Sequence, residues 1–352
     1  MPVVSAPVVV LPRHQVTTEE ILERIEEVYP DHPRLAHLKR FIRATTVRTR
    51  WYTRPLAEQW CTDGSVADRT RRHLQDSLEL AESAARGALL EAGLRPEDVD
   101  AVVVASATGH SIPGLDVPLL DRLGLRPSVR RIPVTQLGCG GGVFGISTAA
   151  ELVTARPGST VLVVCADVFS HYLHQGDTGL DGMIFKGIIG DAAGACVVTS
   201  DARGPHLELR DSGEWLQLHR GSDVVGSFVD DDGLHTFNSR RLLPTIAGVM
   251  PHVKEWFGRA GSDGMHAGPD FVVSHTGSSK ALDAVVAGLG ADPELFGLAR
   301  DSLREVGNVG SVSVLEVMER TFRKPPEDGA HGLVVSLAPG VSVMALRVVW
   351  HG

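Results

Sequence analysis

Three residues of this chain have side chains that can do chemistry together: Cys139, His275 and Asn308. Cys139 stands among glycines in TQLGCGGGVFG, His275 follows an apolar run in FVVSHTGSSK, and Asn308 lies between glycines in VGNVGS. An imidazole can activate a cysteine as a nucleophile, and an asparagine amide and an imidazole N–H can together hold a developing oxyanion. The set therefore predicts covalent catalysis at a cysteine.

We expect each of these residues to lie at a turn between a strand and a helix. A strand that ends near Leu137 precedes Cys139, and a helix begins just after the glycines. The free N–H groups and the dipole at that helix end favour a thiolate, and the glycines let a substrate carbonyl approach the backbone. His275 and Asn308 also precede helices, and ligands collect at such turns in open α/β sheets.

Each of the three residues also has a purely structural interpretation. Cys139 can be a small residue in a crowded turn, His275 a hydrogen-bonded buried histidine, and Asn308 a turn residue in the left-handed conformation. The order and context of all three together favour the catalytic interpretation.

Strand-like and helix-like segments alternate along the chain, which predicts an α/β protein with covered sheets. The clearest segments are the strands 98–109, 131–138 and 160–168 and the helices 17–29, 74–94 and 143–158. The segment 98–109 is similar to 268–279, since both are a strand followed by a small polar loop. We therefore expect two related halves, each a strand–helix unit with its own sheet.

Composition limits the class of protein further. The net charge of the 352-residue chain is -9, which argues against general nucleic-acid binding. The four cysteines form no CxxC pair and no Cys/His cluster with zinc spacing, so we expect no metal and a reducing cytoplasm. The N-terminus lacks a basic leader, and no uncharged apolar run reaches about 18 residues, so we expect neither a signal peptide nor a membrane span.

The chain resembles the type III polyketide synthases, the chalcone synthase-like branch of the thiolase superfamily, in their bacterial form. The order of Cys139, His275 in HTGSSKALD and Asn308 in GNVGS is that of the superfamily, and the segments VASATGHSIPGLDVPLL, IIGDAAGACVV and DGLHTFNSRRLLPTI are similar to type III enzymes. The resemblance implies an α/β, thiolase-like fold whose duplicated βα halves form a layered αβαβα core. Residues 1–200 would carry the cysteine, and residues 201–352 the histidine and the asparagine.

The resemblance also implies a role for each catalytic candidate. Cys139 would carry the starter acyl group, and then the growing chain, as a thioester. His275 would pair with the thiolate and, with Asn308, hold the carbonyl of the extender, whose decarboxylation leaves an enolate that attacks the acyl group in a Claisen condensation. Cyclisation or release would follow. The substrates would be an acyl-CoA starter and a malonyl-CoA-type extender, with no other cofactor, and the enzyme would be a homodimer.

A basic stretch, HLKRFIRATTVRTRW, falls where the family places its contacts to the phosphates of coenzyme A. We assign these contacts to Lys39, Arg40 and Arg43; Arg48 and Arg50 belong to the same stretch. The alternative is an ordinary solvated basic face.

The resemblance places six residues in the substrate pocket: Ala107, Ile112, Tyr172, Ile189, Phe237 and Gly310. Ile189 stands where the family has a gatekeeper phenylalanine, and loss of that ring would widen the passage to the nucleophile. The second gatekeeper, Phe237, is retained. Ile112 would reach across the dimer interface.

The segment SLAPG stands where the family usually has GFGPG, so that Ser336 and Ala338 replace two glycines. Two alternatives to a type III enzyme stay open. One is a ketoacyl synthase III-like enzyme that performs a single condensation, and the other is a non-catalytic homologue that serves as a dimerisation partner or binding module. The intact set of Cys139, His275 and Asn308 favours an enzyme.

Overall fold

The computed structural model describes all residues except 61–64, 202–203, 219–220, 231–233 and 260–267. The helices are α1 (Thr18–Val28), α2 (Leu35–Arg43), α3 (Val66–Glu91), α4 (Asp116–Leu123), α5 (Gly141–Ala155), α6 (Leu180–Ile188), α7 (Leu242–Gly258), α8 (Ser279–Leu289), α9 (Gly297–Glu305) and α10 (Ser313–Arg323). The short 3-10 helices are η1 (Leu56–Glu58), η2 (Pro96–Asp98), η3 (Gly138–Gly140), η4 (Ser170–Tyr172), η5 (Gly221–Asp223), η6 (Pro293–Phe296) and η7 (Gly310–Val312).

The strands are β1 (Val3–Val4), β2 (Val8–Val10), β3 (His14–Thr17), β4 (Thr49–Tyr52), β5 (Ala101–Ser106), β6 (Arg130–Thr135), β7 (Val161–Asp167), β8 (Ala192–Thr199), β9 (His206–Leu216), β10 (Val225–Val229), β11 (Leu234–Asn238), β12 (Phe271–Ser274), β13 (His331–Ala338) and β14 (Ser342–His351). Among the described residues, ten of them form one sheet in the order β12-β13-β14-β9-β1-β8-β7-β5-β6, with β2 paired to β8. Two small antiparallel pairs, β3–β4 and β10–β11, lie outside it.

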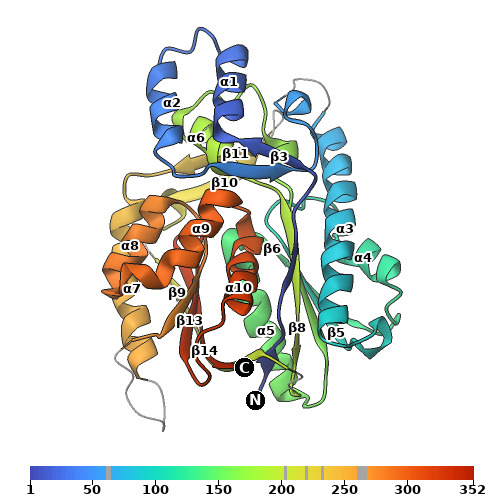
Figure 1. Ribbon diagram of the computed structural model, residues 1–352. Coiled ribbons are helices and arrows are strands. Elements are labelled where there is room, and N and C mark those ends of the chain that lie inside the picture. Colours follow the sequence, from blue (N-terminus) through green and yellow to red (C-terminus); the bar gives the residue numbers. More distant parts are fainter. Residues whose placement is uncertain (61–64, 202–203, 219–220, 231–233, 260–267) are drawn as a thin grey trace.

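The main elements stack in five layers (Figure 1). Helices α7 and α8 cover one outer face, and β9, β13 and β14 lie beneath them. Helices α5 and α10 fill the middle, followed by β5, β7 and β8, with α3 on the other outer face. The expected α/β fold with a layered αβαβα core is therefore confirmed.

The sheet contains the same strand pattern twice. Strand β5 pairs in parallel with β7, which pairs antiparallel with β8; likewise β12 pairs in parallel with β13, which pairs antiparallel with β14. The similar segments 98–109 and 268–279 thus contribute equivalent strands, β5 and β12. The expectation of a separate sheet for each half is wrong, because Val3 of β1 pairs with both Thr199 of β8 and Glu208 of β9 and joins the two sets.

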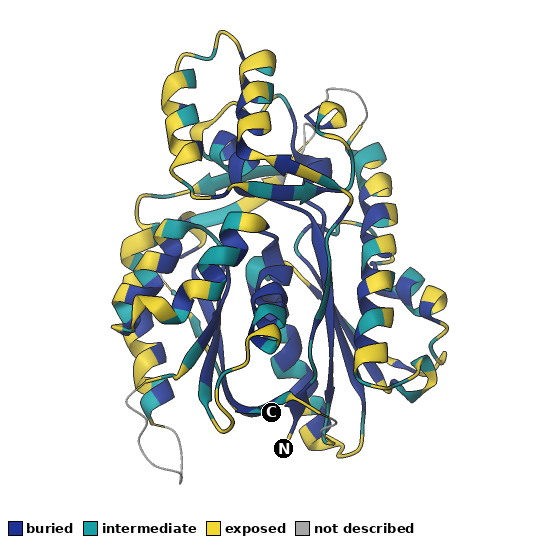
Figure 2. Cartoon of the chain, viewed as in Figure 1, coloured by how far each residue is buried: buried dark blue, intermediate teal, exposed yellow. Residues whose placement is uncertain are grey.

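Burial explains the apolar strands near the centre of the molecule. Every residue of β5 and β7 is buried (Figure 2). Helices α3 and α5 both pack on β7, so this strand needs an almost continuous apolar sequence rather than an alternating one. Only its last residue, Asp167, is charged.

A cap of helices lies above the layers and has its own hydrophobic cluster (Figure 1). Side chains of α1 and α2, including Ile21, Ile25 and Leu38, are fully buried there. Thr17 caps α1: its hydroxyl accepts from the N–H of Glu20 at 3.2 Å, and the Glu20 carboxylate accepts from the N–H of Thr17. None of the described helices is long and apolar enough to cross a membrane.

The tight packing around Gly142 generates a prediction about stability. A Cβ atom at Gly142 of α5 would lie 2.6 Å from Cγ1 of Val314 in α10, and closer still to the carbonyl oxygen of Ser311. We expect Gly142→Ala to lower the free energy of unfolding by about 3 kcal/mol, because a backbone atom cannot give way as a flexible side chain can. Urea unfolding followed by circular dichroism measures the change.

The matched control is Gly248→Ala, at an exposed helical position of α7 where an added Cβ meets nothing within 4 Å. That variant should be unchanged or more stable by up to about 1 kcal/mol. Equal stability of the two variants would contradict the close packing of α5 on α10.

Candidate active site

Cys139 lies in η3, directly between β6 and α5, so it occupies the predicted turn at a helix N-terminus. The turn rests on the hairpin between β13 and β14. The hydroxyl of Ser336 donates to the carbonyl oxygen of Cys139 at 2.6 Å. Gly138 abuts the ring of Pro339, where a Cβ would meet Cδ at 2.5 Å. The altered SLAPG segment is therefore part of the support for the cysteine.

His275 directly follows β12, as the sequence predicts. Its backbone N–H donates to the carbonyl of Val335 at 2.9 Å, which continues the pairing of β12 with β13. The residue is 6% exposed, and both ring nitrogens are buried without a hydrogen-bond partner among the described residues. The side chain of Asn308 lies near the ring, because its interaction with His275 opposes the effect of burial on the pKa of the imidazole.

Asn308 has a different setting from the one expected. It follows α9 and precedes η7, so it lies at a turn between helices and not after a strand of the main sheet. The N–H of Asn308 donates to the carbonyl of Ile188 at 2.8 Å, and its carbonyl accepts from the N–H of Gly190 at 3.0 Å. Together these two hydrogen bonds form an isolated parallel bridge between Asn308 and Ile189. This bridge fixes the asparagine beside the predicted gatekeeper position.

Hydrogen bonds also fix the side chain of Asn308. Its Nδ2 donates to the carbonyl of Gly277 at 3.3 Å, and its Oδ1 accepts from the N–H of Gly310 at 3.0 Å. Gly277 belongs to the turn that carries His275. Because Nδ2 has two hydrogens, the amide retains one donor for a further acceptor.

The three predicted catalytic residues are therefore connected through a few shared contacts. Neighbouring residues of β13, Val335 and Ser336, bond to the turns of His275 and Cys139 respectively. Asn308 bonds to the turn of His275 through Gly277. The structure brings the three turns to one place, although they are far apart in the sequence.

The pKa shifts of Cys139 and His275 oppose the thiolate that the sequence predicts. Cys139 keeps partial exposure to solvent, but burial of the thiol and the nearby charge of Asp167 raise its pKa to about 12. Burial lowers the pKa of His275 to about 4. Burial therefore favours a neutral thiol and a neutral imidazole, and it opposes the thiolate that the helix end favours.

Asp167 is a buried residue of the site that sequence reasoning missed. Its carboxylate accepts from the N–H of Ala107 at 2.6 Å, and from the N–H and the hydroxyl of Ser311 at 2.7 and 2.8 Å. Burial raises the pKa of Asp167, and the hydrogen bonds from Ser311 and Ala107 oppose that shift. An acidic residue at the carboxyl end of a buried strand was the signal available in TVLVVCADV.

Three of the predicted pocket residues surround this carboxylate and Asn308. Ala107 donates its N–H to Asp167, and Ile189 is fully buried on the bridge to Asn308. Gly310 has a φ of 60°, and a Cβ there would lie 2.9 Å from Phe169 and closer still to the carboxylate of Asp167. Only glycine fits this position without displacing Asp167.

The other pocket residues lie in separate surroundings. Tyr172 is fully buried in η4, with its ring 5.3 Å from those of His73 and His110. Phe237 is partly exposed on β11, opposite Gly226 of β10. Ile112 is fully exposed in the loop before α4.

The basic candidates divide into surface and interior residues. Lys39 pairs with Glu26 at 2.8 Å and Arg43 with Glu19 at 2.7 Å, while Arg40 is exposed on the same helix, α2. Arg50, from the same basic stretch, lies in the interior and not on this face. Its guanidinium is fully buried and donates to the hydroxyl of Thr18 at 3.1 Å and to the carbonyl of Gly187.

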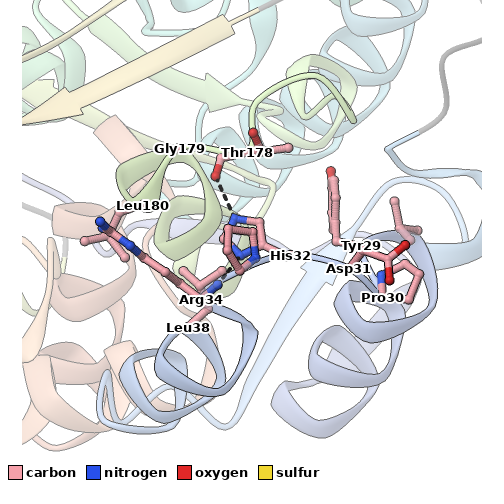
Figure 3. A pocket seen from close by; sticks show the side chains of 11 residues that line it. Tyr29, Pro30, Asp31, His32, Arg34, Leu38, Thr178, Gly179 and Leu180 are labelled. Atoms are coloured by element: carbon pink, nitrogen blue, oxygen red, sulfur yellow. Dashed lines mark hydrogen bonds between the residues drawn. The ribbon is translucent and has the colours of Figure 1, made fainter.

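A surface cavity of about 590 Å³ opens between the α1–α2 connection and the start of α6 (Figure 3). Its lining includes Tyr29, Arg34, Leu38 and Gly179. Nε2 of His32 lies 3.1 Å from the carbonyl oxygen of Thr178 and so connects the two sides of the cavity. None of the predicted catalytic, pocket or coenzyme A residues is among the described residues that line it.

Sequence comparisons identify proteins that are similar to this chain. A family model for the N-terminal domain of chalcone and stilbene synthases matches residues 6–202. The 1,3,6,8-tetrahydroxynaphthalene synthase of Streptomyces coelicolor is 31% identical over 352 residues, which cover 100% of this chain and 93% of that protein. The phloroglucinol synthase of Pseudomonas fluorescens is 30% identical over 340 residues, with 97% of each chain covered.

Solved structures show the same similarity. The crystal structure of the tetrahydroxynaphthalene synthase from Streptomyces coelicolor matches with a TM-score of 0.94 at 30% identity, covering 99% of both chains. Germicidin synthase from the same organism matches with a TM-score of 0.91 at 26% identity and the same coverage. Both are described as type III polyketide synthases.

A layered αβαβα core with a glycine-flanked cysteine between the edge strand β6 and the buried helix α5 is the architecture of the condensing enzymes with a thiolase-like fold. The chain belongs to the chalcone and stilbene synthase family and is a type III polyketide synthase, an acyltransferase that makes carbon–carbon bonds. These matches give no support to the ketoacyl synthase III-like alternative.

The raised pKa of Cys139 predicts how its alkylation depends on pH. Only the thiolate reacts with iodoacetamide, and the thiolate fraction grows about tenfold per pH unit while the pH stays below the pKa. We expect the rate at Cys139 to rise throughout the range from about pH 6 to about pH 9 without a plateau. Mass spectrometry of the peptide that contains Cys139 measures the rate.

Cys165 and Cys196 are fully buried and serve as internal controls that should stay unlabelled; Cys61 lies outside the described residues. A plateau that begins below neutral pH would contradict the neutral pair and would indicate a thiolate–imidazolium pair in the resting enzyme.

Proposed function

We propose that Cys139 carries the acyl chain of a decarboxylative condensation, with His275 as its proton acceptor and Asn308 as an oxyanion donor. The observation that carries this proposal is the connection of the three turns through β13 and Gly277. The substrates are an acyl-CoA starter and a malonyl-CoA-type extender, and the chemistry uses no further cofactor.

The first step is transfer of the starter to the enzyme. The sulfur of Cys139 attacks the thioester carbonyl of the starter, and its proton moves to a ring nitrogen of His275. Because burial keeps the resting imidazole neutral, one nitrogen lone pair is available to accept it. The carbon–sulfur bond to coenzyme A breaks, and the departing sulfur takes the proton back from His275.

The second step makes the new carbon–carbon bond. The extender loses carbon dioxide, and the electron pair of the broken bond forms an enolate whose oxygen accepts from the amide of Asn308 and the N–H of His275. The enolate carbon attacks the thioester on Cys139. That carbon–sulfur bond breaks, the sulfur returns to the thiol form on taking up a proton, and the lengthened chain remains on coenzyme A for reloading, cyclisation or release.

We also propose a homodimer in the cytoplasm, in which Ile112 is covered by the partner. A fully exposed isoleucine in the isolated chain supports this, because an apolar side chain gains from burial.

The chain would divide near residue 200, between β8 and β9, into halves 1–200 and 201–352. Arg40, with Lys39 and Arg43 once they leave their glutamates, would bind the coenzyme A phosphates.

Two variants separate the steps of the mechanism. We expect Cys139→Ala to form no acyl-enzyme and no product, while it still decarboxylates malonyl-CoA because His275 and Asn308 remain. We expect Asn308→Ala to keep acyl labelling but to decarboxylate malonyl-CoA about 10²–10³-fold more slowly, as for loss of an oxyanion donor. Labelled starter and released carbon dioxide are measured separately.

Asn238→Ala is the matched control, because this other asparagine lies exposed on β11 and its variant should decarboxylate at the normal rate. Normal product formation by Cys139→Ala would overturn the covalent mechanism. An unchanged decarboxylation rate in Asn308→Ala would remove that residue from its role.

Ile189 generates a prediction about substrate range. It is fully buried on the bridge to Asn308, and Ile189→Phe puts back the ring that the family usually has there. We expect the variant to lose kcat/KM for long acyl-CoA starters by at least about 10-fold relative to short ones, because the passage narrows. Product masses across a series of starters measure this.

Ile189→Leu is the volume-conserving control and should keep the original starter range. Thermal unfolding of both variants shows whether the larger ring has disturbed the fold. An identical starter range in a folded Ile189→Phe enzyme would show that this position does not gate the pocket.

A further inference from the structure

A group of three potential metal ligands lies outside the site described above. His174, Asp177 and His235 each offer one ligand atom, and the three atoms lie within 4.8 Å of one another. His174 and Asp177 precede α6, while His235 belongs to β11. Sequence spacing did not reveal the group, because the second histidine comes from a distant hairpin.

The most informative member of the group is His174. It is 4% exposed, and its Nε2 is buried without a hydrogen-bond partner among the described residues. A buried polar atom of this kind costs free energy unless something binds it.

Asp177 is held in place by the start of α6. Its Oδ1 accepts from the N–H of Gly179 at 3.3 Å, and its carboxylate packs against Gly182, where a Cβ atom would overlap it. The backbone thus fixes the carboxylate before any ion arrives. Lys186 lies close, since its ammonium group donates to the backbone carbonyl oxygen of Asp177.

His235 is held in a similar way from the other side. Its ring lies 4.7 Å from that of His174 and stacks on Phe228 at 5.1 Å. Its Nε2 is 3.0 Å from Oδ1 of Asp230. A carboxylate on one ring nitrogen orients an imidazole and makes the other nitrogen a better ligand, as around many zinc ions.

We propose that His174, Asp177 and His235 bind one zinc ion. Two imidazoles and one carboxylate suit this borderline ion better than calcium or magnesium, which prefer oxygen ligands. A water molecule would complete the tetrahedron.

The bound ion would connect two segments that carry predicted pocket residues. Tyr172 lies just before His174, and Phe237 lies two residues after His235 on the same face of β11. Zinc would therefore hold the β10–β11 hairpin against the segment before α6. It would set the position of Phe237 without contacting the substrate.

Metal titration of the chelator-treated enzyme tests the proposal without any substrate. We expect one Zn²⁺ per chain by calorimetry, and a visible absorption band of tetrahedral Co²⁺ when cobalt is used as the probe. His235→Ala should weaken Zn²⁺ binding at least about 100-fold and abolish the cobalt band, and Asp177→Asn should weaken binding by about 10–100-fold. Hydrogen exchange in residues 225–229 and 234–238 should slow when zinc is added.

His351→Ala is the matched control. His351 stacks on another histidine, His206, at 4.9 Å and lies 3.0 Å from Glu208, but it is not part of the three-ligand group. It should bind zinc as the parent does. His235 is partly exposed, so its variant is expected to fold, and thermal unfolding checks this.

The absence of saturable zinc binding in the parent enzyme would overturn the proposal. So would unchanged affinity in a folded His235→Ala, or an equal loss of affinity in His351→Ala. Failure of acyl transfer at Cys139 would leave these measurements unaffected, so the two proposals fail separately.

Discussion

The buried carboxylate of Asp167 is the interaction on which the catalytic region depends. It accepts hydrogen bonds from Ala107, at the end of β5, and from Ser311, in the turn after Asn308. A carboxylate in this interior is unfavourable without such donors, so the two segments must keep their positions. Burial of the thiol is the main cause of the raised pKa of Cys139, and the charge of Asp167 adds to it, so the residue that orders the site also disfavours the thiolate.

The fold was largely predictable because its pattern is repeated and local. Alternating strands and helices, and the similarity of 98–109 to 268–279, predicted a duplicated α/β core, and β5 and β12 occupy equivalent places. The single sheet was not predictable from these segments. It depends on β1, whose two residues pair with strands from both halves, and a pattern of two valines carries no information about its partners.

The site was predictable in its residue types but not in its electrostatics. The turns of Cys139 and His275 follow strands as expected, whereas Asn308 lies between helices and owes its position to the bridge with Ile189. Motif reasoning places the thiol at a helix end and so favours a thiolate. The motif does not show how deeply the sulfur is buried or where the carboxylate of Asp167 lies. Burial and that carboxylate together raise the pKa of Cys139.

Ser336 shows how a change in a motif can be compensated by the contact that the new side chain makes. Glycine is usual at this position in the family, and glycine could not donate a side-chain hydrogen bond. Here the serine hydroxyl donates to the carbonyl oxygen of Cys139, and Pro339 of the same segment packs on Gly138. The altered segment thus supports the cysteine turn. The replacement of GFGPG by SLAPG was the one feature of the sequence that favoured a non-catalytic homologue. Because the replacement changes how the cysteine turn is held and leaves Cys139 in place, it no longer favours that alternative.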